Sequence, residues 1–487
     1  MLFNGYGFIF TFLPITFFIY FYLNHKRLTE ASKGFLVFSS LFFYSWWNIT
    51  YLPIILSSML FNYIVGNSLN SGHNNHRLSK KSILTFGIVS NIALLCYFKY
   101  TDFMIDNLNY WIFTKDMPNL NLALPLAISF FTFQQISYLV DSYRQETKEY
   151  DFLNYALFVT FFPQLIAGPI VHHKEMMPQF SKIRNKVKNY KNIAMGLFIF
   201  FIGLFKKVVI ADTFAQWATA GFDKPEVLTF FEAWATSLTY TFQLYFDFSG
   251  YTDMAIGAAL LFNIRLPINF NSPYKATDIQ DFWRRWHMTL SRFMRDYIYI
   301  PLGGNKNGNT SACINVFSVA LISGLWHGAG WTFVIWGAMH GTALVVHRVW
   351  KQLGFTMNSI LAWFITFNFI NITWIFFRAK EWDDALLILS NMFAPTSIRL
   401  PKFTDKYFDA PPEIFAFGGW MNHITYDGGK MVVFSICIGL CLIFRNNTND
   451  LSTKNIRSLK YVFFSIILLL ISLGYMSNEE VFLYYEF

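Results

Sequence analysis

The chain has 487 residues and carries 38 Lys and Arg against 29 Asp and Glu, which gives a formal net charge of +9. Hydrophobic residues make up 54% of the chain and aromatic residues 20%, whereas charged residues reach only 14%. A soluble domain normally has about a quarter of its residues charged, so this composition excludes a soluble enzyme, and the apolar content also excludes a disordered chain. We therefore expect a polytopic membrane protein.

Apolar stretches follow one another along the whole sequence. A helix needs about 20 mostly apolar residues to cross the hydrocarbon core of a bilayer. The first such stretch runs from Tyr6 to Leu23; without a basic start or a small-residue cleavage site, it is expected to be a retained span and not a signal peptide. Together the stretches predict an all-α, polytopic transmembrane bundle of roughly 11 spans, which forms a single domain over residues 1–487.

The charged loops predict the orientation of these spans. Lys and Arg gather in the connections 24–34, 67–81, 174–191 and 446–460, whereas 101–121 and the C-terminal tail are acidic. Positive loops face the cytoplasm, which predicts both termini on the periplasmic side of a bacterial inner membrane. The charge is spread over loops and does not form a basic groove with stacking aromatics, so no nucleic-acid partner is expected.

The apolar segment 152–171 does not resemble a simple span. It is interrupted by Pro163, Gly168 and Pro169, and a strongly basic loop follows it. If both of its flanks are cytoplasmic, the segment is re-entrant and buried among helices. A kinked ordinary span is the alternative, and the sequence favours neither.

The first of three polar features in chain order is the stretch 240–253, where carboxylates and a serine interrupt an apolar run. Asp247, Ser249 and Asp253 are candidates for lining a cavity, because buried carboxylates in membranes are usually paired or functional. An unpaired buried charge is expensive, and Arg284 or Arg295 are the partners that we expect for these aspartates.

Residues 278–301 form a two-faced pattern that is too polar to cross lipid. On one continuous helix, His287, Ser291 and Arg295 fall within about 60° of Arg284. The helix either lies in the membrane interface, with its arginines on lipid phosphates, or lines an aqueous cavity inside the bundle. Several arginines on one side suit an anionic ligand, so these residues are candidate cavity-lining groups.

The glycine-rich stretch 321–341 places His327 at membrane depth. A histidine there is costly unless it is paired or functional, and imidazole is the side chain best suited to general-base work on a hydroxyl. Trp326 beside it is a further candidate for the cavity wall. On a continuous helix, His340 and His347 lie on the opposite face, and a structural role is expected for both.

Three motifs carry a family resemblance: YFDFSGYTDMAIG at 245–257, NSPYKATDIQDFWRRWHMTLSRFMRDYIYIPLGGN at 271–305 and LWHGAGWTFVIWGAMHG at 325–341. Together they resemble the bacterial branch of the membrane-bound O-acyltransferases, in particular its alginate-acetylating and peptidoglycan-acetylating members. The resemblance extends over roughly residues 1–380, with WIFFRA at 374–379 as its last motif.

The resemblance implies acyl transfer inside a helical bundle that encloses a tunnel. His327 matches the invariant histidine of the family, and His287, 40 residues before it, matches the second functional position. The implied reaction moves acetyl from a cytoplasmic thioester such as acetyl-CoA, with no bound cofactor or metal, to a hydroxyl of a polysaccharide or of a periplasmic acetyltransferase partner. His327 is the implied general base, and His287 orients the donor or stabilises the oxyanion.

Several alternatives stay open from the sequence. A covalent acyl-enzyme needs a nucleophile, for which Ser249, Ser291 and His327 are the candidates. D-alanyl transfer from a carrier protein for teichoic acid modification is a second function within the same superfamily. A non-enzymatic transporter of lipid or solute is the third, and it is disfavoured because the chain has no internal repeat.

Overall fold

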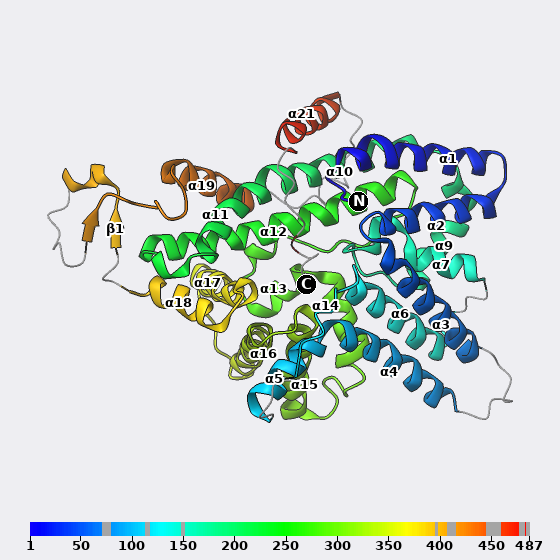
Figure 1. Cartoon of the computed structure of the whole chain (residues 1–487), viewed down its shortest axis with the longest axis horizontal. Helices are drawn as coiled ribbons and strands as arrows, with labels where there is room; N and C mark the ends of the chain where they lie inside the picture. The colour runs from blue at the N-terminus through cyan, green and yellow to red at the C-terminus, as the bar shows by residue number, and fades with distance from the viewer. Residues whose placement is uncertain are drawn as a thin grey trace.

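The computed structural model describes residues 1–70, 79–112, 117–147, 151–394, 398–406, 415–444, 459–476 and 483. Parts of the loops that set the expected orientation lie outside these ranges: Arg77, Lys115, Asp116, Lys454, Arg457, Glu479, Glu480 and Glu486. Within the described ranges the chain is almost entirely helical (Figure 1).

The first group of helices, drawn in blue and cyan in Figure 1, gathers at one end of the molecule, except for residues 101–111, which extend toward the centre, where Trp331 Nε1 donates to Asn107 Oδ1 at 2.9 Å. It consists of α1 (Leu13–His25), which continues the π-helical turn η1 (Phe8–Phe12), and of α2 (Thr29–Ser45), α3 (Leu52–Asn70), α4 (Lys80–Lys99), α5 (Thr101–Trp111), α6 (Ile128–Tyr143), α7 (Phe152–Thr160), α8 (Phe162–Leu165) and α9 (His173–Ser181). Helices α3, α4 and α6 pack against one another in this group.

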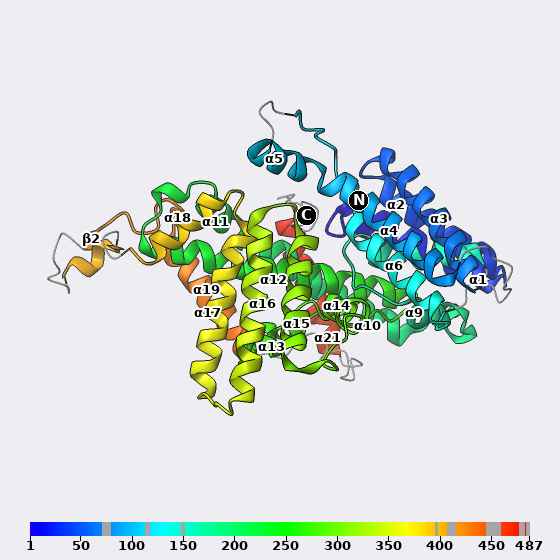
Figure 2. The ribbon, with the colours of Figure 1, turned by 90° about the horizontal axis from the view of Figure 1, so that it is seen from below.

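The second group occupies the centre. It consists of α10 (Tyr190–Phe205), the π-helical segment η4 (Lys206–Ala211), α11 (Asp212–Phe222), α12 (Phe230–Leu261), α13 (Ile279–Arg285), α14 (Met288–Met294), η7 (Arg295–Tyr299), α15 (Gly308–His327), α16 (Trp331–Gln352) and α17 (Ser359–Arg378). Figure 2 shows α15, α16 and α17 running side by side.

Helix α12 is the hub of the fold. It has 32 residues, a length of about 48 Å, and a Thr229–Glu232 capping box holds its N-terminus. It packs against α10, η4, α11 and α17, so most of its side chains are buried. A long central helix that is buried on nearly every side needs apolar residues all round, and any polar residue on it needs a partner inside the protein.

Six helical segments among the described residues are long and apolar enough to cross a membrane. They are Phe8–His25, Ile49–Asn70, Lys80–Lys99, Tyr190–Phe222, Gly308–His327 and Ser359–Arg378. Two shorter apolar helices, Gly428–Leu442 and Lys460–Tyr475, follow in the C-terminal part. This arrangement is that of a multi-pass membrane protein.

The interrupted segment 152–171 forms two short helices, α7 and α8, separated at Phe161. Residues 155–173 are buried without exception. Buried turns at membrane depth are tolerated because neighbouring protein groups satisfy their backbone: the Phe162 N–H, for example, donates to Ser40 Oγ over 3.1 Å.

The C-terminal region departs from an all-α fold. It contains α18 (Trp382–Met392), a parallel pair of short strands, β1 (Ile398–Leu400) and β2 (Phe415–Phe417), and then α19 (Gly428–Phe444) and α21 (Leu459–Tyr475). Ile398 pairs with Phe415 and Leu400 with Phe417. Three-residue strands are too short to produce an alternating pattern in the sequence, so the sequence did not predict this small sheet within an otherwise all-α fold.

Candidate active site

Helix α15 ends at His327, and two side chains from the end of α4 hold its last carbonyls. Lys99 Nζ donates to the Trp326 carbonyl at 2.7 Å and to the His327 carbonyl at 2.9 Å, and the Tyr100 hydroxyl donates to the Leu325 carbonyl. The last carbonyls of a helix lack partners within the helix, and a cation there also meets the negative end of the helix dipole. This cap fixes the position of His327.

Glycine allows α15 and α16 to meet closely around this point. A Cβ on Gly324 would clash with the Phe333 carbonyl oxygen and lie 3.0 Å from Gly337 Cα, and a Cβ on Gly328 would overlap the Phe333 ring. Gly324 and Gly328 therefore allow the close packing of these two helices.

The His327 imidazole is 3% exposed and is surrounded by aromatic rings. Its ring centroid lies 4.8 Å from that of Trp326, 5.2 Å from that of Trp336 and 5.1 Å from that of Phe377, all three with steeply inclined planes. Such edge-to-face contacts orient a ring without supplying a counter-charge.

His287 lies at a break in the chain between α13 and α14. It has φ 43° and ψ 53°, a left-handed conformation that is uncommon for a residue with a side chain. Asn269 stabilises this turn: its Oδ1 accepts from the Thr289 N–H at 3.2 Å and from Thr289 Oγ1 at 2.9 Å, and it lies 3.1 Å from His287 Nδ1. Strained backbone held by a dedicated partner is common at functional sites.

Trp326 brings the two histidines together. Its ring contacts the His327 ring and lies 6.3 Å, centroid to centroid, from that of His287. Its other face stacks on Phe133 at 5.0 Å and 17°. We refer to His287, Trp326, His327, Trp336 and Phe377 as the histidine site.

A pocket of about 440 Å³ adjoins this site. Gly328, which follows His327, and Phe377, which contacts its ring, both line it, together with residues of 98–102, 122–124 and 378–380 and Leu483. The histidine site therefore lies at the wall of a space large enough for part of a sugar or a peptide.

The expected cavity face of 278–301 does not exist as one helix. The break at His287 separates α13 from α14, so Arg284, Ser291 and Arg295 do not share a face with His287 as the continuous helix required. Arg284 is exposed, Ser291 Oγ donates to the Trp283 carbonyl at 3.0 Å, and Arg295 forms an ion pair with Asp296 at 2.7 Å. The pattern of polar and apolar residues is compatible with one helix through this turn, so the sequence did not predict the break.

The arginine partners predicted for the α12 aspartates were also wrong. Lysines from η4 take this role: Lys206 Nζ lies 2.7 Å from Asp253 Oδ2, and Lys207 Nζ lies 3.0 Å from Asp247 Oδ1. Lys207 Nζ is also 2.6 Å from Asp212 Oδ1. We call these five residues the lysine–aspartate network. Two adjacent lysines inside the apolar stretch 194–222 were the sequence signal for it.

Two contacts connect the lysine–aspartate network with the histidine site and its pocket. Phe248, next to Asp247 on α12, packs edge-on against the His287 ring at 4.8 Å. Asp247 Oδ2 also accepts from the Leu483 N–H at 2.9 Å, and Leu483 lines the pocket. Ser249 is buried on α12 between the two aspartates.

His340 and His347 lie on α16, whereas His327 ends α15. The three histidines therefore do not lie on one continuous helix, as the sequence analysis assumed. His340 Nδ1 accepts from Trp283 Nε1 at 3.2 Å, and its Nε2 lies 3.1 Å from Thr373 Oγ1. His347 Nε2 is 3.4 Å from Asp278 Oδ1. These contacts fit the structural role expected for both.

Three residues of the site gave little sequence signal. Asn269 lies in a loop without a motif, Lys99 ends an apolar span, and Phe377 belongs to the WIFFRA motif, which does not indicate a contact with His327. Their roles depend on contacts between segments far apart in the chain. The described residues contain no group of three or more His, Cys, Asp or Glu that could hold a metal ion.

Comparisons with known proteins show which family the chain is similar to. Residues 10–379 match the family described as membrane-bound O-acyltransferase. The chain is 48% identical to the peptidoglycan O-acetyltransferase of Helicobacter pylori, over 100% of this chain and 98% of that protein. It is 39% identical to the probable alginate O-acetylase AlgI of Pseudomonas aeruginosa, over 81% of this chain and 75% of that protein. It is also 28% identical to the teichoic acid D-alanyltransferase of Streptococcus thermophilus, over 52% and 68%.

The family match covers more than half of the chain, and the relative from Helicobacter pylori covers all of it. The chain belongs to the membrane-bound O-acyltransferase family.

Proposed function

We propose that this enzyme O-acetylates a cell-envelope polysaccharide, taking acetyl from a cytoplasmic thioester and delivering it across the membrane to a hydroxyl of the polymer or of a periplasmic partner protein. The observation that carries the proposal is the buried pair His287 and His327 around Trp326 beside a pocket. The 48% identity to a peptidoglycan O-acetyltransferase over the full chain supports acetyl as the group transferred.

The proposal includes a membrane arrangement. The six long apolar segments and two shorter ones, with further buried helices, are consistent with roughly 11 spans, with α7 and α8 as a re-entrant segment and with a central tunnel for the donor. The distribution of Lys and Arg favours an inner-membrane protein with both termini in the periplasm. The pocket next to His327 would then receive the acceptor.

In the proposed reaction, the acceptor hydroxyl oxygen attacks the thioester carbonyl carbon while His327 takes the hydroxyl proton. The tetrahedral intermediate collapses, the carbon–sulfur bond breaks, and the thiolate leaves with a proton returned by His327. The surrounding aromatic rings exclude water and leave the imidazole neutral and ready to accept a proton. Acetyl-CoA is the donor that we propose, with no bound cofactor.

For His287, the hydrogen bonds of Asn269 favour donor orientation over oxyanion stabilisation. The Thr289 backbone N–H can only donate, so the Asn269 atom that it meets is the oxygen. His287 Nδ1, which faces the same oxygen, must then carry the proton. A neutral ring protonated at Nδ1 has an acceptor at Nε2, which suits an amide N–H of a CoA-type donor and not a developing oxyanion.

Direct transfer is favoured over a covalent acyl-enzyme. The Ser291 hydroxyl donates to the Trp283 carbonyl, and Ser249 is buried on α12. A nucleophile activated by a base needs a hydrogen bond to that base, whereas the Ser291 hydroxyl is directed to a backbone carbonyl. A labelled acetyl group on the denatured protein at short times would reverse this preference.

The test is acetyl transfer by the purified protein in proteoliposomes, with labelled acetyl-CoA outside and polysaccharide fragments, with or without a periplasmic partner protein, inside. We expect label on the polymer from the parent protein and a loss of about 10²–10⁴-fold for His327→Ala. Activity within a few-fold of the parent would remove His327 from the role of base. Unaltered activity of His287→Ala as well would revive the transporter alternative.

D-alanyl transfer is the second candidate function, and the match to a teichoic acid D-alanyltransferase over 52% of the chain favours it. The same vesicles supplied with carrier-bound D-alanine distinguish the two. Transfer from the carrier, with none from acetyl-CoA, would replace acetyl by D-alanyl as the group transferred.

A further inference from the structure

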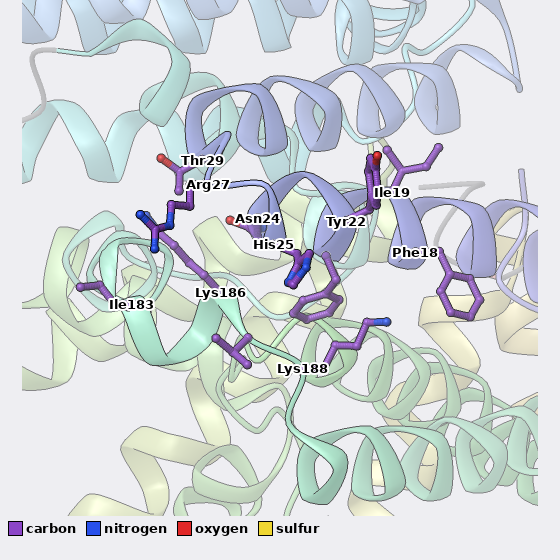
Figure 3. A pocket seen from close by; sticks show the side chains of 12 residues that line it. Phe18, Ile19, Tyr22, Asn24, His25, Arg27, Thr29, Ile183, Lys186 and Lys188 are labelled. Atoms are coloured by element: carbon purple, nitrogen blue, oxygen red, sulfur yellow. The ribbon is translucent and has the colours of Figure 1, made fainter.

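A second hollow lies far from the histidine site and shares no residue with it. It has a volume of about 1060 Å³ and lies between the C-terminal end of α1 and the segment 183–188, which includes the 3₁₀ turn η3 (Ile183–Lys186) (Figure 3). The apolar span Phe8–His25 ends here and basic residues begin. That change of composition marks the surface of the membrane.

The hollow has a basic rim. His25 and Arg27 come from the end of α1, and Lys186 and Lys188 come from the opposing segment. No carboxylate lines the hollow, and none of these four side chains forms an ion pair with a carboxylate in the part of the chain that the structure describes. Arg27, Lys186 and Lys188 therefore give the rim positive charge that no carboxylate among the described residues pairs with.

The rest of the wall is apolar and aromatic. Phe18 and Tyr22 are each 60% exposed along α1, and Ile183 and Val187 face them from the other side. Lys188 Nζ lies 5.4 Å from the centroid of the Phe18 ring, so a cation–π contact holds this charge at the border between the two zones. Positive charge above an apolar wall complements a molecule with an anionic head and hydrocarbon chains.

We propose that this hollow binds an anionic phospholipid, with its phosphate among Arg27, Lys186 and Lys188 and its acyl chains along Phe18 and Tyr22. Arginine and lysine both bind phosphate strongly, and an anionic leaflet attracts basic residues at the membrane surface. The lipid joins the first helical hairpin to the connection between α9 and α10. It therefore stabilises the contact between the first and second groups of helices.

The test is lipid binding by the full-length protein in detergent, measured by native mass spectrometry and by the shift of the melting temperature. The probes are phosphatidylglycerol, phosphatidylcholine of the same chains, and inorganic phosphate. We expect phosphatidylglycerol to bind at least tenfold more tightly than phosphatidylcholine and to raise the melting temperature, because a ligand of the folded state stabilises it. Phosphate alone should do neither.

The variant Arg27→Gln/Lys186→Gln/Lys188→Gln should lose at least tenfold in affinity for phosphatidylglycerol. The matched control is Lys182→Gln/Arg184→Gln/Lys191→Gln, which removes the same charge from exposed residues of the neighbouring segment that do not line the hollow. We expect the control to bind within twofold of the parent.

Three outcomes would overturn the proposal. An equal loss of phosphatidylglycerol affinity in the control variant would mean that the lipid is attracted by diffuse charge. Equal binding of phosphatidylcholine would mean an unselective apolar surface. Equal stabilisation by inorganic phosphate would mean a site for a soluble anion. The lipid comparison on the parent protein decides the question even if the triple variant fails to fold.

Discussion

The histidine site and the lysine–aspartate network bury polar groups at similar depth in opposite ways. In the network, opposite charges meet directly: Lys207 contacts both Asp212 and Asp247, and all three are at most 3% exposed. In the histidine site, His287 and His327 are equally buried, but aromatic rings and an amide surround them.

If the proposed roles of His287 and His327 hold, this difference separates structural polar groups from catalytic ones. A buried ion pair keeps its charges fixed, because removing either charge leaves the other uncompensated. A neutral imidazole packed against aromatic rings is able to accept a proton and return it within one catalytic cycle. Burial of a polar residue in a membrane protein thus does not identify a catalytic group, whereas the nature of its neighbours does.

The largest effect should come from His327→Phe. The replacement keeps a ring between Trp326, Trp336 and Phe377 and removes only the proton acceptor. We expect acetyl transfer to fall by about 10²–10⁴-fold, with the melting temperature in detergent close to that of the parent. A large fall in melting temperature would show that His327 belongs with the network as a structural group.

Lys207→Met should show the reverse pattern. It leaves the Asp212 and Asp247 carboxylates buried without their shared cation, and breaking a buried pair costs about 3–5 kcal/mol. We expect a strong fall in the melting temperature and in the yield of folded protein, measured against Lys182→Met on the exposed surface. An unchanged melting temperature would contradict the structural role of the network.

Asn269→Leu should have an intermediate effect, which we expect to be larger on catalysis than on stability. It removes the acceptor that fixes the His287 tautomer and the left-handed turn. Losing such a hydrogen bond corresponds to about tenfold in rate. If His287 orients the donor, the KM for acetyl-CoA should rise more than kcat falls, and His287→Asn, which keeps an acceptor, should retain more activity than His287→Ala. A fall in kcat alone would favour the oxyanion role instead.

The sequence predicted the two histidines and the membrane fold because both depend on local signals. His327 is conspicuous in an apolar run, and spans are read from hydropathy. It did not predict the turn at His287, since the residues on both sides of it are compatible with a helix. It also did not predict the pairing of η4 with α12, because Lys206 and Asp253 are 47 positions apart and nothing local indicates which of several basic residues folds against an aspartate.

The smallest effect should come from replacing a whole pair in the network. Lys206 and Asp253 are partly exposed, at 14% and 12% of their side chains, and lie beside the more deeply buried Lys207. Removing both charges together, as in Lys206→Met/Asp253→Leu, eliminates the attraction and also the cost of burying two ions, and such replacements are often neutral. We expect a change in unfolding free energy within about 1 kcal/mol for the double variant and a clear loss for either single variant. Since the proposed reaction assigns no step to either residue, acetyl transfer by the double variant should stay within a few-fold of the parent. A double variant that folds normally but loses activity would show that the charges of this pair are needed by the reaction and not by the fold. The pair would then belong with the catalytic groups.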